Sequence, residues 1–259
     1  MQKREAAGNL DTGLLKIIAL CCMVIDHVGA RLLSTHIELR IIGRIAFPLY
    51  IWCMVVGTCY TKNPARYALR LLLAGLISQP FYMLGLNHGW DKWSIFMTLL
   101  MGYLGICGIR YNRFGSRWWA PVLVLLTACF VDMDYGWGGV MLIMLMYLAR
   151  RSRGGNAAVV VAFCLYWGAG SGNIQQVFGC SLRELPLYNT PIARAFLHLQ
   201  TMALLALPLI LWPRTKRTPF PKWASYGAYA GHLFLLWLAQ LALGVTNLAA
   251  ARQLLIPWM

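Results

Sequence analysis

Charged residues are scarce in this sequence, and acidic residues are the scarcest. Only 12% of the 259 residues are charged, with 8 acidic residues against 23 lysines and arginines, while 59% are hydrophobic. This composition excludes an ordinary soluble domain, whose surface carries far more charge. A long soluble segment is also lacking, because apolar runs recur from one end of the chain to the other. We therefore expect residues 1–259 to form a single integral-membrane domain.

Several motif classes are missing as well. No Walker or dinucleotide glycine pattern occurs between a strand and a helix, which excludes a nucleotide-binding fold. The eight cysteines lie mostly inside apolar segments and lack the paired spacing of a zinc site, so we expect no metal. A cleavable signal peptide is not expected either, because the first apolar run is long and lacks a small-residue cleavage site. No internal repeat is visible.

What is present is a series of apolar segments with the residues typical of helix ends between them. They lie at roughly 13–33, 41–61, 65–86, 93–110, 117–132, 135–149, 157–170, 191–213 and 223–244. The sixth and seventh are short for a full crossing, so tilted, re-entrant or longer helices are alternatives there. The prediction is an all-α fold, a polytopic transmembrane helical bundle of about nine spans. Asp11 or Thr12 is expected to cap the first helix.

The loops account for the net charge of +15. One alternating set of loops is rich in basic residues, such as Arg110, Arg151 and Arg217, and the other set holds acids such as Asp91 and Asp134. Basic loops stay on the cytoplasmic side of a membrane, so this pattern predicts a cytoplasmic N-terminus. We expect the lipid bilayer, and not nucleic acid, to be the partner of these charges. The expected location is the bacterial inner (plasma) membrane.

The first apolar run, residues 14–33, carries an acid and an imidazole side by side, Asp26 and His27. Ionisable residues at membrane depth cost about several kcal/mol, and they usually serve a proton, an ion or a substrate. We interpret the pair as functional, with a buried structural pair as the alternative. The two side chains point about 100° apart around a helix, so Asp26 is expected to pair with Arg44 or Arg40.

Polar residues from several predicted helices share one depth in the outer half of the bundle, at a rise of about 1.5 Å per residue. The members of this layer are His27, Arg44, Gln79, Thr98, Asp132, Asp134, His198, Gln200 and His232. Scattered structural residues would not share a depth, so we expect a site in this layer. Simpler roles remain open for some members, such as snorkelling for Arg44 and helix packing for Thr98.

At the cytoplasmic mouths of the first and third predicted helices stand three basic residues, Lys16, Arg66 and Arg70. Arginine forks suit phosphate geometry, so these residues are candidates to hold the phosphates of an anionic cofactor. Ordinary topology-setting charge is the alternative reading.

A family resemblance rests on several stretches of the sequence. Two of them are specific, residues 15–19 with 23–29 and residues 40–49, and looser ones lie at residues 67–70, 77–80, 98 with 102, and 134–136. Over about residues 10–240 the chain resembles the TraX family of membrane acyltransferases, which is named for the acetylase of conjugal pilin. The resemblance implies an acetyl-CoA-dependent transmembrane O- or N-acetyltransferase, with acetyl-CoA as co-substrate and an acceptor presented from the other face. It does not identify the acceptor, and the oligomeric state is open.

We therefore expect a membrane acyltransferase in which His27 is the general base. Asp26 is expected to support the site, and Arg44, Thr98 or His232 to stabilise the tetrahedral oxyanion. Lys16, Arg66, Arg70 and Gln79 are the expected cofactor-binding residues. A proton-coupled transporter is the alternative, although it would show repeat symmetry, and a non-catalytic membrane scaffold is another.

Overall fold

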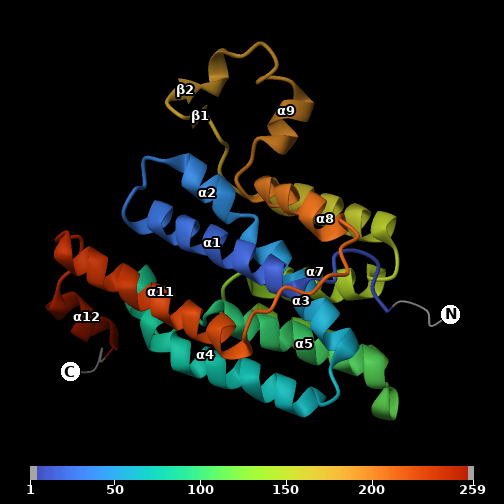
Figure 1. The fold of residues 1–259 in the computed structure, drawn as a ribbon. Helices are drawn as coiled ribbons and strands as arrows, with labels where there is room; N and C mark the ends of the chain where they lie inside the picture. Colours follow the sequence, from blue (N-terminus) through green and yellow to red (C-terminus); the bar gives the residue numbers. More distant parts are fainter. Residues whose placement is uncertain (1–4, 256–259) are drawn as a thin grey trace. The chain divides into compact units, whose positions relative to one another are not determined.

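The computed structural model describes residues 5–255, and most of these residues are helical (Figure 1). In chain order the helices are α1 (Thr12–Arg31), α2 (Ile37–Gly43), α3 (Ala46–Tyr60), α4 (Pro64–Leu86), α5 (Ile95–Tyr111), η1 (Arg113–Gly115), α6 (Ser116–Phe130), α7 (Gly136–Ala149), α8 (Arg153–Gly168), η2 (Leu182–Glu184), α9 (Pro191–Phe196), η3 (Gln200–Ala206), α10 (Leu207–Leu211), α11 (Lys222–Ala242) and α12 (Leu248–Leu255). Two short strands, β1 (Gln176–Val177) and β2 (Cys180–Ser181), pair antiparallel. The predicted all-α helical fold is confirmed.

Most of the predicted spans correspond to single helices, and two do not. The segment 41–61 is divided between α2 and α3 by a turn at Arg44 and Ile45, where the Arg44 side chain bonds Asp26 and Gln200. The segment 191–213 is divided into α9, η3 and α10. Leu197 leaves the helical conformation there, and His198 pairs as an isolated bridge with Asn173. Tertiary contacts override a continuous apolar pattern at both places.

Three helical segments of the described chain have the length and apolarity of membrane spans: Thr12–Arg31, Ile37–Tyr60 and Pro64–Leu86. Shorter apolar helices occur at Ile95–Tyr111, Gly136–Ala149 and Gln200–Leu211. These helices identify a membrane protein, and the count of nine spans stays a prediction.

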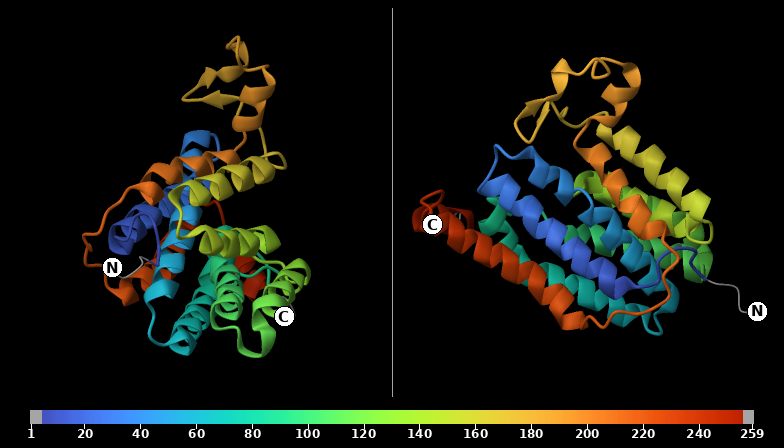
Figure 2. Two further views of the ribbon diagram at one scale, coloured as in Figure 1. Left: turned by 90° about the vertical axis from the view of Figure 1, so that its right-hand side faces the viewer. Right: turned by 45° about the horizontal axis from the view of Figure 1, so that its top comes forward.

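The helices form two compact units, and each is discontinuous in sequence. Unit 1 comprises residues 1–53 and 149–220, and unit 2 comprises residues 54–148 and 221–259. The division places α1, α2 and α8 in unit 1, and α4, α5, α6 and α11 in unit 2. Figure 2 shows the same helices from two further directions. Each unit is considered by itself below.

The start of α1 anchors unit 1. Asp11 is the N-cap of α1, as predicted, and its Oδ1 accepts the Leu14 N–H at 3.1 Å. The same carboxylate also accepts hydrogen bonds from the backbone and hydroxyl of Thr218 and from Arg214, at 2.7–2.9 Å. Burial by itself would raise the pKa of Asp11, but these hydrogen bonds outweigh it and hold the pKa below the ordinary value.

In unit 2, α4 packs against both α5 and α11. Asn63 caps the start of α4 by accepting the Arg66 N–H at 2.9 Å, and Pro64 occupies the first turn, where a missing N–H costs nothing. The buried Gln240 of α11 donates to the carbonyl of Gly85 at 2.8 Å. A Cβ at Gly85 would come within 2.8 Å of the Leu233 carbonyl, so this glycine permits the close approach of α4 and α11.

Candidate active site

The antiparallel neighbours α1 and α2 pack unusually closely, and this closeness positions Asp26. Gly29 of α1 faces α2, where an added Cβ would lie 2.7 Å from the Cβ of Leu39. Gly43 of α2 faces Asp26, and an added Cβ there would collide with the carboxylate itself. Two glycines therefore let the short side chain of Asp26 reach the backbone and arginines of α2.

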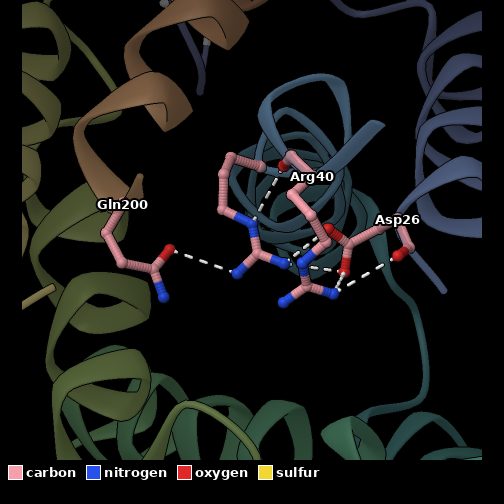
Figure 3. A network of polar contacts seen from close by, with 4 residues as sticks. Asp26, Arg40 and Gln200 are labelled. Carbon is pink, nitrogen blue, oxygen red and sulfur yellow. Dashed lines mark hydrogen bonds and ion pairs between the residues drawn. The ribbon is translucent and has the colours of Figure 1, made fainter. Parts of the chain in front are cut away.

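Two arginines from α2 and its C-terminal cap converge on the Asp26 carboxylate (Figure 3). The Nη2 of Arg44 donates to both carboxylate oxygens, at 2.5 and 2.6 Å. The Nη1 of Arg40 donates to Oδ2 at 3.0 Å and to the backbone carbonyl of Asp26 at 3.3 Å. The predicted pairing of Asp26 with Arg44 or Arg40 is confirmed, and the carboxylate binds both.

The three charged groups are removed from water to different degrees. Asp26 and Arg44 are each only 7% exposed, whereas the side chain of Arg40 is 27% exposed. One carboxylate against two guanidinium groups leaves a net charge of +1. Removal of one partner of such a buried ion pair destabilises the folded protein by about 3–5 kcal/mol. The cluster therefore presents a fixed positive charge inside an apolar helical unit.

A fourth residue, Gln200 at the start of η3, ties the cluster to a distant part of the chain. Its Oε1 accepts a hydrogen bond from Nη1 of Arg44 at 3.3 Å, and its backbone N–H donates to the hydroxyl of Ser171 at 3.2 Å. His198 lies next to this contact, with its Nδ1 2.8 Å from the carbonyl of Ser171. Unit 1 thus joins Arg44 and Gln200, two members of the predicted polar layer, to Asp26.

His27 follows Asp26 directly on α1 and is half-buried. Its side chain projects about 100° around the helix from that of Asp26. The Asp26 carboxylate is held by the two arginines, which leaves His27 to present its ring in another direction. His27 is therefore the sequence neighbour of the Asp26 that anchors the two arginines, on the same helix α1.

In unit 2 the predicted residues Gln79 and Thr98 hold two neighbouring loops. The Gln79 amide donates to the Lys92 carbonyl at 2.8 Å and accepts the Ser94 N–H at 3.0 Å. The hydroxyl of Thr98 donates to the carbonyl of Asp134. Both ends of the Gln79 amide are engaged by backbone, so its role toward a cofactor stays a prediction, as does the role of Thr98.

His232 lies on α11 of unit 2. Its Nδ1 is 2.9 Å from the carbonyl of Ala228, one turn earlier, which favours the tautomer with the proton on Nδ1. Its ring meets that of Tyr229 edge-on, with centroids 5.4 Å apart. His232 and Thr98 belong to unit 2, whereas His27 and the arginine cluster belong to unit 1.

The predicted phosphate-binding residues also divide between the units. Lys16 lies on α1 of unit 1, and Arg66 and Arg70 lie on α4 of unit 2. The Arg70 guanidinium lies 5.4 Å from the ring centroid of Tyr67, and its buried Nε has no hydrogen-bond partner within residues 5–255. A buried donor of this kind calls for an acceptor, so Arg70 fits an anionic ligand.

Sequence reasoning left Gly43 out of the predicted site, whereas it named Arg40 as an alternative partner of Asp26 and Gln200 as a member of the polar layer. Arg40 and Gln200 complete the cluster around Arg44, and Gly43 makes room for it. The spacing of Arg40 and Arg44, four residues apart on one helical face, was a signal available for Arg40. For Gln200 and Gly43 the decisive contacts are between segments distant in sequence, which no local pattern reveals.

Comparison with known proteins adds family information. A family model described as TraX protein matches residues 11–240. A protein of Dichelobacter nodosus described as "Probable fimbrial assembly protein FimC, serogroup H1" is 39% identical over 150 residues, covering 52% of this chain and 60% of that protein. An uncharacterized protein of Rickettsia prowazekii (strain Madrid E) is 29% identical over 148 residues, covering 54% of this chain and 56% of that protein. The chain thus spans between half and two thirds of the length of these relatives. No solved structure matches it.

Proposed function

Because the chain belongs to the TraX family, we propose that it is an integral-membrane acyltransferase that transfers acetyl from acetyl-CoA to a hydroxyl or amine acceptor. The observation that carries this proposal is the ion cluster of Asp26 with Arg40 and Arg44, in which Asp26 is followed directly by His27 on the apolar helix α1. Acyl transfer requires a base for the acceptor and positive charge for the developing oxyanion. One helical hairpin, α1 with α2, supplies both kinds of group.

His27 is the proposed general base. It accepts the proton from the acceptor hydroxyl or amine as that atom forms its bond to the acetyl carbonyl carbon, and it returns the proton to the departing sulfur. The Asp26 carboxylate is engaged by two arginines, and no proton transfer is assigned to it. Asp26 is therefore a positioning residue for the arginines.

The arginines supply the positive charge. The Arg44 guanidinium is already bound by Asp26, Gln200 and the Arg40 carbonyl, so it acts chiefly as a buried anchor. Arg40 is the more exposed of the two and is the better placed in this cluster to meet negative charge on a substrate. Thr98 and His232 of unit 2 stay as further candidates for the oxyanion.

Two basic residues of α4, Arg66 and Arg70, are proposed to hold the phosphates of the donor. Arg70 has an unsatisfied buried Nε, and Arg66 is exposed at the first turn of α4. The expected roles of Lys16 on α1 and of Gln79 on α4 toward the donor stay predictions. When bound, acetyl-CoA supplies the activated thioester. With a cytoplasmic N-terminus, these residues face the cytoplasm and the acceptor arrives from the other side.

The relative described as a fimbrial assembly protein suggests a class of acceptor. We extend its role to this chain as part of the proposal, with a fimbrial subunit or another exported molecule as the acceptor. The proposed location is the bacterial inner membrane, from which such molecules depart.

The experiment that tests the proposal uses the purified full chain in detergent with radiolabelled acetyl-CoA. We expect saturable binding and slow hydrolysis of the thioester, with transfer when an acceptor is added. Hydrolysis that persists unchanged in His27→Ala would contradict the role of His27. Absence of acetyl-CoA binding, together with proton uptake by reconstituted vesicles, would favour the transporter instead.

A further inference from the structure

Unit 1 carries a small lobe between α8 and η3, residues 170–199, which contains β1, β2, η2 and α9. In Figures 1 and 2 the lobe projects beyond the helices of unit 1. A narrow neck closes it, since the Ile174 N–H bonds the Leu197 carbonyl at 2.8 Å and the Leu199 N–H bonds the Gly172 carbonyl at 3.0 Å. The lobe is therefore a defined substructure and not a loose loop.

Large apolar side chains cover the outside of this lobe. Phe178 is 81% exposed, Leu187 73% and Ile192 74%, and Leu185 is exposed as well. Four such side chains within about fifteen residues form more apolar surface than water-facing loops normally carry. The lobe has almost no interior of its own to bury them, because Ile174 is its only buried hydrophobic residue among those described.

The turn of the β-hairpin has a strained backbone at its apolar tip. Phe178 and Gly179 form the turn between β1 and β2, with φ values of 50° and 76°. A two-residue turn with two positive φ values favours Asn-Gly, and an aromatic residue in the first position is strained. The backbone N–H of Phe178 is held by the carboxylate of Glu38 on α2, so the ring points outward from an anchored turn.

The lobe carries more basic than acidic side chains. Arg183 and Arg194 are both exposed, and Glu184 is the sole acidic residue in the segment. Apolar side chains next to arginines are typical of segments that lie in the interface of a bilayer, where the cations meet lipid phosphates. The lobe leads directly into Gln200–Leu211, one of the shorter apolar helical segments of the described chain, so it is continuous with an apolar element.

We propose that this lobe lies on the bilayer surface, with Phe178, Leu187 and Ile192 inserted among the headgroups and Arg183 and Arg194 bound to anionic phosphates. The occupant of the apolar surface is thus lipid. The neck of the lobe leads into Gln200, whose amide accepts from Arg44. Contact of the lobe with lipid would therefore help to hold Gln200 in its position next to Arg44. The proposal stands whether or not the chain is an acyltransferase.

The test places the purified full chain in lipid nanodiscs of phosphatidylcholine, with or without phosphatidylglycerol. A fluorophore is attached at Leu187→Cys after the exposed cysteines 21, 129 and 180 are changed to serine. Gln176→Cys, at an exposed polar position of the same lobe, is the matched control. We expect spin-labelled lipid to quench the probe at 187 and aqueous iodide to quench the probe at 176. Equal access of iodide to both positions would overturn the proposal.

A second measurement tests the charge and avoids the label. Removal of either arginine, by Arg183→Gln or Arg194→Gln, should weaken membrane insertion. The ratio of molecules with an inserted lobe to molecules with a water-exposed lobe should fall about fivefold in phosphatidylglycerol discs at low salt. Amide hydrogen exchange of residues 178–194 in the unlabelled protein should be slower in phosphatidylglycerol than in phosphatidylcholine. Equal exchange in both lipids would contradict the proposal. Protection that appears only with two copies per disc would assign the surface to a second protomer and would also overturn it.

Discussion

Gly43 of α2 lies directly against the carboxylate of Asp26 on α1, so closely that a single added methyl group would occupy the space of that carboxylate. The two residues are seventeen positions apart in sequence and belong to different helices. A glycine at this position is therefore a condition for the buried ion cluster.

The first prediction follows from this contact. Gly43→Ala should force Asp26 or α2 to shift and should lower the free energy of unfolding by about 1–3 kcal/mol, the usual cost of overpacking. Gly227→Ala is the control, because a Cβ at that helical glycine meets nothing within 4 Å and alanine favours the helix. Thermal unfolding in detergent compares the two variants. Equal melting temperatures would contradict the close contact.

The second prediction separates the two arginines. Arg44→Gln should unfold or strongly destabilise the protein, because it removes the better-buried partner of Asp26, at a cost of about 3–5 kcal/mol. Arg40→Gln should leave the protein folded, since Arg44 still binds the carboxylate, but should slow acetyl transfer about 10²–10³-fold if Arg40 stabilises the oxyanion. Melting temperature and turnover are measured for both variants. A folded, fully active Arg40→Gln would remove Arg40 from the proposed mechanism.

The third prediction concerns pH and the start of α1. The pKa of Asp11 lies below its ordinary value of 3.8, so its hydrogen bonds stabilise the fold above that value and are lost as the pH falls through the lowered pKa. Asp11→Asn should therefore cost about 1–3 kcal/mol at pH 7. The difference between wild type and variant should shrink at pH below 3.8. A difference that stays constant down to pH 3 would show that the carboxylate charge is irrelevant.

The sequence predicted the helical class, most helix positions and the cap at Asp11, because hydropathy and capping residues are local signals. It did not predict that the segments 41–61 and 191–213 would be broken. The side chain of Arg44 bonds Asp26 and Gln200, and the backbone of His198 pairs with Asn173, and an unbroken apolar pattern carries no trace of these contacts. The division into two units was likewise not visible, since each unit joins distant parts of the chain.

The candidate site was predictable only in part. Asp26 and His27 stood out because ionisable residues are costly in an apolar helix, and helical geometry was enough to pair Asp26 with the arginines that follow. The participation of Gln200 depends on a contact across 156 positions of sequence.

The fourth prediction tests the donor site. Arg70→Ala should weaken CoA binding by about 1–3 kcal/mol, or roughly 5–150-fold, if its buried Nε and guanidinium hold a phosphate. Arg117→Ala is the control, since Arg117 is an exposed arginine at the start of α6. Titration of CoA against both variants decides the question. Unchanged affinity would move the phosphate site away from Arg70, though not to Arg110, whose guanidinium binds the carbonyls of Thr58 and Cys59.

The last prediction concerns His27, which follows Asp26 directly on the apolar helix α1. His27→Ala should leave the protein folded and able to bind CoA, because the Asp26–Arg44 contact does not involve the imidazole. Acetyl transfer should fall about 10²–10⁴-fold, the usual scale for loss of a general base. His27→Gln separates shape from proton transfer, since glutamine keeps hydrogen bonding but cannot accept a proton and return it. Both variants are compared with wild type for CoA binding and for single-turnover transfer to one acceptor. If His27→Gln transfers acetyl at nearly the wild-type rate, His27 is a positioning residue, and the base must be sought at His232 or Asp134.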